Sequence, residues 1–245
     1  MDTKKINPGI IYDAWLSNII KRPSYKIDLY CGVNGEDLSK GIRSVQVQDN
    51  FLYSKIPISD VERICLIEKL GFHLIETNVI FEKKRAPKGA FKNNAVIRYS
   101  TPEDEEAVVR IAEKSFLFSR FHMDPGFSRE TADTLKAEWS RSYFKGQRGD
   151  HLVVADMNGV VAGFNLLMEE TANRICIDLI AVDGAYRKQG IGSDLISFVE
   201  EKLSKYEYIK VGTQIANVLS LRLYENMGFK ITEAFYTFHY HHAVK

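Results

Sequence analysis

The sequence has few of the features that mark a secreted or membrane-bound chain. Its 245 residues include three cysteines, Cys31, Cys65 and Cys176, which are odd in number and widely spaced. Cys65 and Cys176 each sit among aliphatic residues, which predicts buried free thiols rather than a disulfide framework or a zinc site. No apolar run approaches the roughly 20 residues of a transmembrane helix, and residues 1–16 lack the apolar stretch of a signal peptide. We therefore expect a cytoplasmic protein with no membrane partner.

An excess of charge of either sign is also missing. The chain has 33 lysine and arginine residues against 32 aspartate and glutamate residues, a formal net charge of +1. This balance gives no reason to expect a nucleic-acid partner. Hydrophobic residues make up 45% of the chain and charged residues 27%, which is typical of a globular protein with a sizeable core.

One break in composition divides the chain. Residues 83–94, KKRAPKGAFKNN, are basic, contain Pro87 and Gly89, and show no apolar periodicity. We place a linker at 86–94, between a smaller domain at 1–85 and a full domain at 95–245. A nucleic-acid-binding arm is the alternative, but the run is short and lacks an aromatic platform.

The second domain shows the periodicities of a mixed α/β (α+β) sheet. Thr101-Pro102-Glu103-Asp104 is typical of a helix start, and Asn158-Gly159 is typical of a β-hairpin turn. We expect strands at 95–99, 151–156, 160–168, 175–182, 209–213 and 234–241, and helices near 102–112, 129–144, 192–203 and 217–226.

The two halves share a short motif. Glu68-Lys69-Leu70-Gly71-Phe72 is similar to Glu225-Asn226-Met227-Gly228-Phe229, and each leads from a helix into an aliphatic and aromatic strand. We infer that residues 1–85 are a partial, degenerate copy of the fold in the second half. Chance similarity is the alternative, because helices often end in a left-handed glycine.

The strongest functional signal is Arg187-Lys188-Gln189-Gly190-Ile191-Gly192, between an apolar strand and a helix. Backbone N–H groups at a helix N-terminus bind phosphates, and Gly190 and Gly192 let an anion approach the backbone closely. Arg187 and Lys188 add positive charge. Neither the dinucleotide pattern G-x-G-x-x-G nor the P-loop pattern G-K-[ST] is present. The motif predicts a pyrophosphate site, with a ligand-free strand–helix turn as the alternative.

This motif, with Val182 before it, resembles the acetyl-CoA signature Q/R-x-x-G-x-G/A of the GNAT superfamily of N-acetyltransferases. The resemblance covers about residues 95–240. It implies a GNAT fold, acetyl-CoA as cosubstrate, no metal, and direct acetyl transfer to a primary amine on a small molecule. The cofactor-binding residues that it implies are Ile180, Ala181, Val182, Arg187, Lys188, Gln189, Gly190, Ile191, Gly192, Ser193, Asn217 and Ser220.

The helix after Asn217 carries a second signal. At about 100° per residue, Asn217, Ser220 and Tyr224 fall within an arc of roughly 60°, beside an apolar arc of Leu219, Leu223 and Met227 that we expect to be buried. The resemblance implies that Asn217 binds the cofactor and that Tyr224 is the catalytic general acid, which protonates the CoA thiolate. A tyrosine packed at the edge of the core is the alternative for Tyr224.

Ile67 takes the position of Tyr224 when the two halves are aligned on Gly71 and Gly228, and no R-x-x-G-x-G precedes Gly71. We therefore expect the first half to bind no CoA and to carry out no acetylation.

The acceptor side is less well marked. Arg120, Phe121 and His122 fall in the segment that borders the acceptor pocket in the GNAT family, and Trp139 and Tyr143 offer aromatic faces to a sugar or a base. Trp139 and Tyr143 could equally fill the core beneath their helix. Oligomeric state stays open, and a homodimer is compatible with the sequence.

The chain is also similar to the dTDP-fucosamine acetyltransferases, which acetylate an amino group on a nucleotide-linked deoxysugar. The likeness includes Leu70-Gly71-Phe72, Ser119-Arg120-Phe121, Trp139, Asp150-His151 and Thr213-Gln214, and departs at residues 122–125 and 147–149. It implies an acceptor such as a dTDP-linked 4-amino-4,6-dideoxyhexose, with Arg120 and Arg148 available to its diphosphate. Peptide or small-amine acetylation, or acyl-CoA sensing without catalysis, are the alternatives.

Three further groups are weaker candidates. His239, His241 and His242 are expected at an exposed strand end rather than in a metal site, because no Asp, Glu or Cys pairs with them at ligand spacing. Glu138 and Asp178 could act as general bases, although single acids in helices and strands are more often structural.

Overall fold

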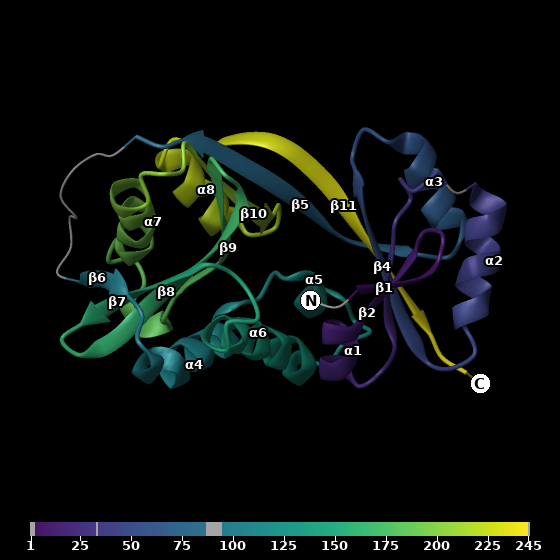
Figure 1. Ribbon diagram of the computed structural model, residues 1–245, viewed down its shortest axis with the longest axis horizontal. Helices are drawn as coiled ribbons and strands as arrows, with labels where there is room; N and C mark the ends of the chain where they lie inside the picture. Colours follow the sequence, from purple (N-terminus) through teal and green to yellow (C-terminus); the bar gives the residue numbers. More distant parts are fainter. Residues whose placement is uncertain (1–2, 33, 87–94, 245) are drawn as a thin grey trace. The chain divides into compact units, whose positions relative to one another are not determined.

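The computed structural model describes residues 3–32, 34–86 and 95–244 (Figure 1). Of the linker expected at 86–94, residues 87–94 lie outside the described residues. The chain divides into two compact units. The first unit contains Met1–Asn78, Arg120–Thr131 and Ala234–Lys245, and the second contains Val79–Ser119 and Ala132–Glu233.

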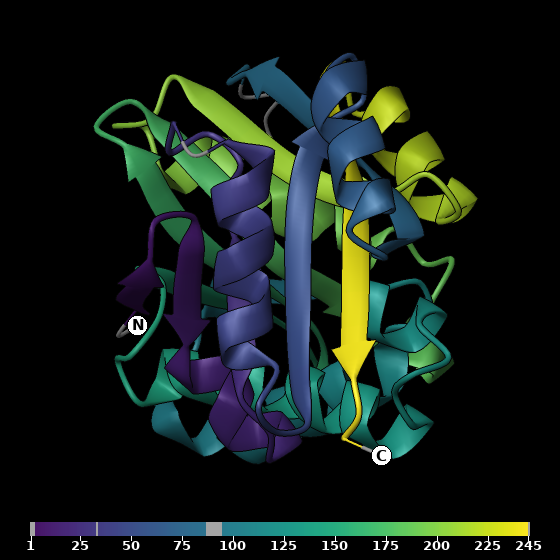
Figure 2. The same cartoon turned by 90° about the vertical axis from the view of Figure 1, so that its right-hand side faces the viewer.

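The first unit is a sheet with helices on it. Its elements are β1 (Thr3–Asn7), β2 (Ile10–Asp13), α1 (Ala14–Ile20), β3 (Ser24–Ile27), α2 (Gly35–Val45), β4 (Asn50–Pro57), α3 (Val61–Lys69), the start of β5 (His73–Lys84), α5 (Arg120–Met123) and the end of β11 (Lys230–His242). β2 pairs antiparallel with β1 and β3, β3 pairs parallel with β4, and β4 pairs antiparallel with β11. Figure 2 shows β4 and the yellow β11 side by side with α2 and α3 in front of them.

The second unit contains the elements expected after the linker. They are β6 (Val96–Tyr99), a 3₁₀ turn η1 (Pro102–Asp104), α4 (Glu105–Ser115), α6 (Arg129–Phe144) from Ala132 onward, β7 (His151–Met157), β8 (Val160–Thr171), β9 (Arg174–Val182), a 3₁₀ turn η2 (Gly184–Tyr186), α7 (Ile191–Lys202), β10 (Tyr208–Gln214) and α8 (Val218–Asn226). Its strand order is β5-β10-β9-β8-β7-β6. β6 to β9 pair antiparallel, and β9 pairs parallel with β10, so the expected mixed sheet is confirmed.

Local sequence signals set several of these boundaries. α6 begins at Arg129 and ends at Phe144, as the periodicity predicts. Asn158 and Gly159 both have positive φ, 55° and 84°, which a two-residue hairpin turn requires. Apolar residues of α4 and α6 pack on β8 and β9 from one side of the sheet, and α7 covers the other side (Figure 1).

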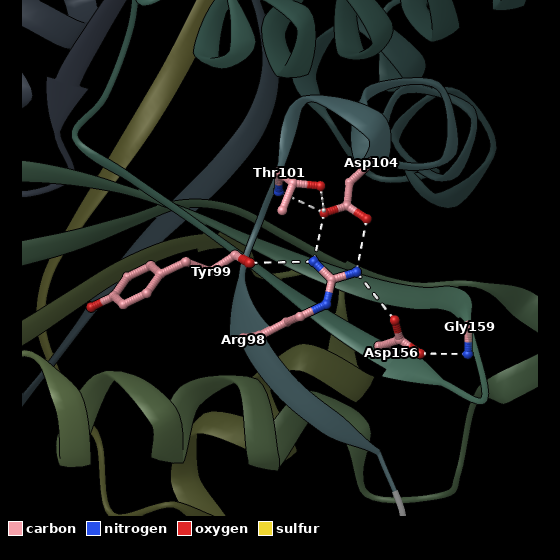
Figure 3. A network of polar contacts seen from close by, with 6 residues as sticks. All are labelled: Arg98, Tyr99, Thr101, Asp104, Asp156 and Gly159. Carbon is pink, nitrogen blue, oxygen red and sulfur yellow. Dashed lines mark hydrogen bonds and ion pairs between the residues drawn. The ribbon is translucent and has the colours of Figure 1, made fainter.

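The helix start at Thr101 is confirmed and is part of a larger polar network (Figure 3). Asp104 accepts hydrogen bonds from the N–H and the hydroxyl of Thr101 and two more from Arg98 on β6, at 2.7 and 3.0 Å. Arg98 also donates to Asp156 on β7 at 3.1 Å. The network therefore ties η1 to the edge of the sheet.

The motif shared by the two halves has the same geometry in both. α3 and α8 begin at residues 61 and 218 and end at 69 and 226, so 157 residues separate both ends. Gly71 and Gly228 each have a φ of 87°, and each donates to a glutamate carbonyl at 2.9 Å, that of Glu68 or Glu225. The parallel β3–β4 pair of the first unit matches the parallel β9–β10 pair of the second.

Two strands have residues in both units. β5 starts in the first unit and ends beside β10 in the second, whereas β11 starts in the second and ends beside β4 in the first. The packing units therefore interleave along the chain. The division into a domain at 1–85 and a domain at 95–245, with the first a degenerate copy, stays a prediction.

Cys65 contradicts the expected buried thiol. It is exposed, because Ile64 and Ile67 of α3 face the core and Cys65 lies on the outer side of the helix. Cys176 is half-buried, which meets the expected burial only in part. Within the described ranges, no helix is long and apolar enough to span a membrane.

Candidate active site

A pocket of about 480 Å³ lies in the second unit. Its walls come from residues 115–119, from the end of β9, from the loop before α7 and from α8. Every residue of the predicted cofactor set lines it except Gln189, whose side chain is exposed; these are Ile180, Ala181, Val182, Arg187, Lys188, Gly190, Ile191, Gly192, Ser193, Asn217 and Ser220. Tyr224 lines it as well.

One wall of the pocket is the end of β9. The parallel ladder between β9 and β10 runs from Arg174–Tyr208 to Ile177–Val211 and continues no further within the described residues. Ile180 to Val182 and Gln214 of β10 then line the pocket. The other edge of β9 stays paired with β8, from Thr171–Arg174 to Gly163–Val182. The edge of β9 that faces the pocket thus offers backbone groups to an extended ligand.

The loop before α7 has the geometry of an anion site. Lys188 and Gly190 have left-handed φ values of 63° and 80°, and Gly190 is the N-cap of α7. Ile191 and Gly192 begin the helix, where N–H groups have no intrahelical acceptor and the helix dipole is positive. Arg187 donates from Nε to the carbonyl of Val182 at 3.1 Å, which fixes the loop to the end of β9.

Tyr224 is the buried residue of α8. It is 3% exposed, and its ring packs at 5.7 Å from the rings of Phe81 and Phe229. Burial raises the pKa of Tyr224 well above its ordinary value, with a further contribution from Cys176, so the phenol is protonated at neutral pH. Asn217 caps the helix by accepting from the N–H of Ser220 at 3.3 Å.

The predicted burial of Leu219, Leu223 and Met227 is wrong for Leu219, and Leu223 and Met227 are half-buried. Leu219 is 78% exposed, and both Leu219 and Leu223 line the pocket. Helical spacing gave the relative phase of these residues correctly but assigned the wrong arc to the core. The side of α8 that carries Tyr224 faces the core because the Tyr224 ring packs against Phe81 and Phe229. Phe81 is far from α8 in the sequence, and Phe229 follows the end of the helix.

Comparison with known proteins shows a family match for part of the chain. Residues 111–229 match the Acetyltransferase (GNAT) family, and this match includes β9, the loop before α7 and all of α8. The chain carries a GNAT acetyltransferase domain. It is an acetyl-CoA-dependent acetyltransferase.

Three similar proteins add to this comparison. The spore coat polysaccharide biosynthesis protein SpsD of Bacillus subtilis is 27% identical over 251 residues, covering 97% of this chain and 85% of SpsD. N-alpha-acetyltransferase 30 of Dictyostelium discoideum is 33% identical over 92 residues, covering 36% of this chain and 50% of that protein. A tandem GNAT protein from the clavulanic acid biosynthesis pathway has a similar fold, with a TM-score of 0.61, 12% identity, and coverage of 96% of this chain and 79% of that one.

Trp139 and Tyr143, two of the predicted acceptor residues, are hydrogen-bonded to Asp178 within the GNAT domain. Trp139 Nε1 and Tyr143 Oη each donate to Asp178 Oδ2 at 2.7 Å. Arg148 donates from Nε to Oδ2 at 2.6 Å and from Nη2 to Oδ1 at 2.7 Å. Burial tends to raise the pKa of Asp178, but these donors outweigh it and hold that pKa below its usual value. The Asp178 carboxylate is therefore unsuited to act as a general base, and Glu138 is paired with Arg141.

Arg120, Phe121 and His122, the remaining predicted acceptor residues, belong to α5 in the first unit. Phe121 is buried against Phe51 and Phe127, so its ring is part of the core. The guanidinium of Arg120 lies 4.0 Å from the ring centre of Tyr53. His122 is half-buried. The structure thus does not bring these three residues into one unit with Trp139 and Tyr143.

The C-terminal histidines contradict the prediction of an exposed strand end. His239 is 1% exposed, and Asp124 Oδ2 accepts from His239 Nδ1 at 2.6 Å and from His241 Nε2 at 2.7 Å. These three side chains offer metal-type ligand atoms within 4.8 Å of one another. The prediction that no acid pairs with these histidines is wrong, because Asp124 contacts them although it is more than a hundred residues away in the sequence.

Hydrogen bonding determines where the protons lie in this cluster. Arg22 can only donate, so its Nη2, 2.8 Å from His241 Nδ1, makes that nitrogen an acceptor and leaves the proton on Nε2. Nδ1 of His239 carries the proton donated to Asp124, and no described residue donates to its Nε2. Both histidines are thus neutral donors to one carboxylate. Burial lowers the pKa of His239 to about 4.

We predict that Gly190→Ala weakens acetyl-CoA binding by roughly tenfold or more, because a Cβ occupies the backbone approach to the anion and the left-handed φ of 80° is strained for alanine. Isothermal calorimetry measures this. Gly159→Ala is the matched control, since Gly159 has a φ of 84°, open space around it and no place in the pocket. Equal binding by both variants would remove the loop from the site.

We predict that the free energy of unfolding falls as the pH drops from about 6.5 toward about 4, the pKa of His239 in the folded protein. In this window the unfolded histidine, with a pKa of about 6.5, binds a proton that folded His239 does not. Urea titrations at successive pH values measure the effect. His239→Asn keeps a donor for Asp124 but cannot titrate, so its stability should depend less on pH; an identical pH dependence would contradict the assignment.

Proposed function

We propose that this protein transfers the acetyl group of acetyl-CoA to the amino group of a nucleotide-linked amino-deoxysugar. The observation that carries the proposal is the continuity of the pocket, which runs from the N-terminus of α7, along Ile180 to Val182, to the buried hydroxyl-bearing ring of Tyr224. A phosphate site, a strand edge and a protonated acid are the three features that an acyl-CoA needs.

The cofactor residues fit the parts of acetyl-CoA in order. The N–H groups of Ile191 and Gly192 and the charges of Arg187 and Lys188 suit the pyrophosphate. The pocket-facing edge of Ile180 to Val182 suits the amide-containing pantetheine arm. Asn217 and Ser220 on α8 complete the wall beside this arm.

Transfer would then proceed by direct attack. The neutral amine forms a C–N bond to the thioester carbonyl, a backbone N–H near Ile180 stabilises the oxyanion, and the C–S bond breaks. Tyr224 gives its proton to the departing sulfur, and the proton of the amine passes to water. No covalent enzyme intermediate is required.

The acceptor class rests on sequence relatives. SpsD, similar over 97% of this chain, is named for spore coat polysaccharide biosynthesis, and the resemblance to dTDP-fucosamine acetyltransferases extends over both halves. Arg148 is committed to Asp178, so the diphosphate of such an acceptor would depend on other cations. A second candidate is acetylation of a peptide N-terminus, favoured by the 33% identity to an N-alpha-acetyltransferase over 92 residues.

The first unit, in this proposal, is a degenerate repeat without its own cofactor site. Asn34, which caps α2, replaces the glycine that caps α7, and the first half has no R-x-x-G-x-G. Ile67 is fully buried at the position that corresponds to Tyr224. The fold likeness to a tandem GNAT protein supports the repeat.

A panel of acceptors tests the proposal. Purified protein with acetyl-CoA is offered nucleotide-linked amino sugars, the free amino sugars, polyamines and peptide N-termini, and release of free CoA is followed. We expect a dTDP-linked 4-amino-4,6-dideoxyhexose, or a close relative, to be the best substrate and the free sugar to be much poorer. Turnover of peptides alone would replace the sugar assignment with the second candidate.

We predict that Tyr224→Phe lowers kcat by roughly 100-fold or more with little change in acetyl-CoA affinity, because it removes the proton donor and keeps the ring packing. Steady-state kinetics and calorimetry separate the two quantities. Tyr206→Phe, at a fully buried tyrosine of the same unit that does not line the pocket, is the control. Full activity of Tyr224→Phe would exclude the tyrosine from the mechanism.

A further inference from the structure

Asp178 is the irregular residue of β9. In the pairing with β8, Leu166 lies opposite Leu179 and Leu167 lies opposite Ile177, so Asp178 is the extra residue of a β-bulge. The parallel ladder with β10 also ends at Ile177. Asp178 therefore stands where β9 leaves β10, two residues before the segment that lines the pocket.

Four hydrogen bonds hold this bulge from outside the sheet. They reach Asp178 from Trp139 and Tyr143 on α6 and from Arg148 just beyond it, at 2.6 to 2.7 Å. The side chains of Asp178 and Arg148 are 8% and 16% exposed, so this ion pair is largely shielded from water. A paired and nearly buried carboxylate that accepts four hydrogen bonds has little freedom to move.

The turn after α6 places Arg148 against Asp178. Gly146 and Gly149 both have left-handed φ values, 64° and 69°, and Gln147 and Arg148 both donate their N–H groups to the carbonyl of Ser142. A Cβ at Gly149 would lie 1.9 Å from Cε1 of Tyr143. Glycine at this position therefore lets the turn fold over the tyrosine ring and place the guanidinium on Asp178.

We propose that Arg148 and Asp178 are positioning residues, which fix the departure of β9 from β10 and so hold Ile180 to Val182 in place for acetyl-CoA. Trp139 and Tyr143 take part through the same carboxylate, and they serve the cofactor side of the reaction rather than contacting the acceptor. This inference rests on the proposed function of Ile180 to Val182 as the wall that binds the pantetheine arm.

The test compares Arg148→Met with Arg98→Met. Arg98 also makes an ion pair in the second unit, with Asp104, and its side chain is 33% exposed (Figure 3). Arg98 does not line the pocket. For both variants, the free energy of unfolding, the Kd of acetyl-CoA, and the KM values of acetyl-CoA and of the acceptor are measured at a temperature where both are folded. Arg148→Lys is the conservative variant, which keeps the charge but not the two-point contact.

We expect both methionine variants to lose stability. Arg148→Met alone should bind acetyl-CoA roughly tenfold more weakly and show a raised acetyl-CoA KM, because displaced backbone no longer matches the ligand, while the acceptor KM stays unchanged. Arg148→Lys should fall between this variant and the wild type. Tyr143→Phe removes one donor and keeps the ion pair, so we expect a smaller loss of acetyl-CoA affinity. This variant replaces Arg148→Met in the test if Arg148→Met does not fold.

Three results would overturn the inference. The first is wild-type acetyl-CoA binding by Arg148→Met, or by Tyr143→Phe if that variant replaces it. The second is a loss of acetyl-CoA affinity in Arg98→Met as large as that in Arg148→Met. The third is a rise in the acceptor KM in place of the acetyl-CoA KM, which would make Arg148 and Asp178 part of an acceptor site. If the wild type itself bound no acetyl-CoA, the proposed function would fall together with this inference. If the wild type binds and transfers but the variants are unaffected, only the positioning role falls.

Discussion

The separation of β9 from β10 is the constraint on which the pocket depends. Up to Ile177 the two strands share a parallel ladder, and beyond it the edge of β9 faces the pocket. The N–H and C=O groups of an unpaired strand edge need other partners, such as water or a ligand, so the strand must be held in position by contacts on its other sides. Here β8 pairs with one edge of β9, and the bulge at Asp178 is hydrogen-bonded to α6 and the turn that follows it.

The remaining parts of the pocket are attached to the end of this strand. Arg187 bonds back to the carbonyl of Val182, so the loop that carries Gly190 follows the position of β9. A Cβ at Gly192 would be only 3.5 Å from Leu223, which means that α7 and α8 meet closely beside the loop. Tyr224 is held by Phe81 and Phe229 at the inner end of the same pocket. Strand, loop and helix therefore act as one assembly.

Local features of the site could be predicted from the sequence, whereas distant pairings could not. The R-x-x-G-x-G loop, the bounds of α6 and the Asn-Gly hairpin depend on neighbouring residues, and the structure has them as expected. Asp178 meets donors 30 to 39 residues away, and Asp124 meets histidines 115 and 117 residues away. No spacing rule links such residues, so the sequence suggested acceptor contacts for Trp139 and Tyr143 and an exposed end for His239. The sequence did contain one signal for these pairings: Asp178 and Asp124 each lie among apolar residues, where a buried carboxylate needs hydrogen-bond donors.

The central claim is that one cofactor site exists, on the second unit, between the end of β9 and α7. Hydrogen–deuterium exchange with and without acetyl-CoA tests it most directly, since the first unit has a strand and a helix, β3 and α2, that the proposed repeat would pair with β9 and α7. The account predicts slower exchange at residues 178–194 on addition of acetyl-CoA and unchanged exchange at residues 24–32 and 34–45. Protection at the first-unit segment, or none at 178–194, would contradict it.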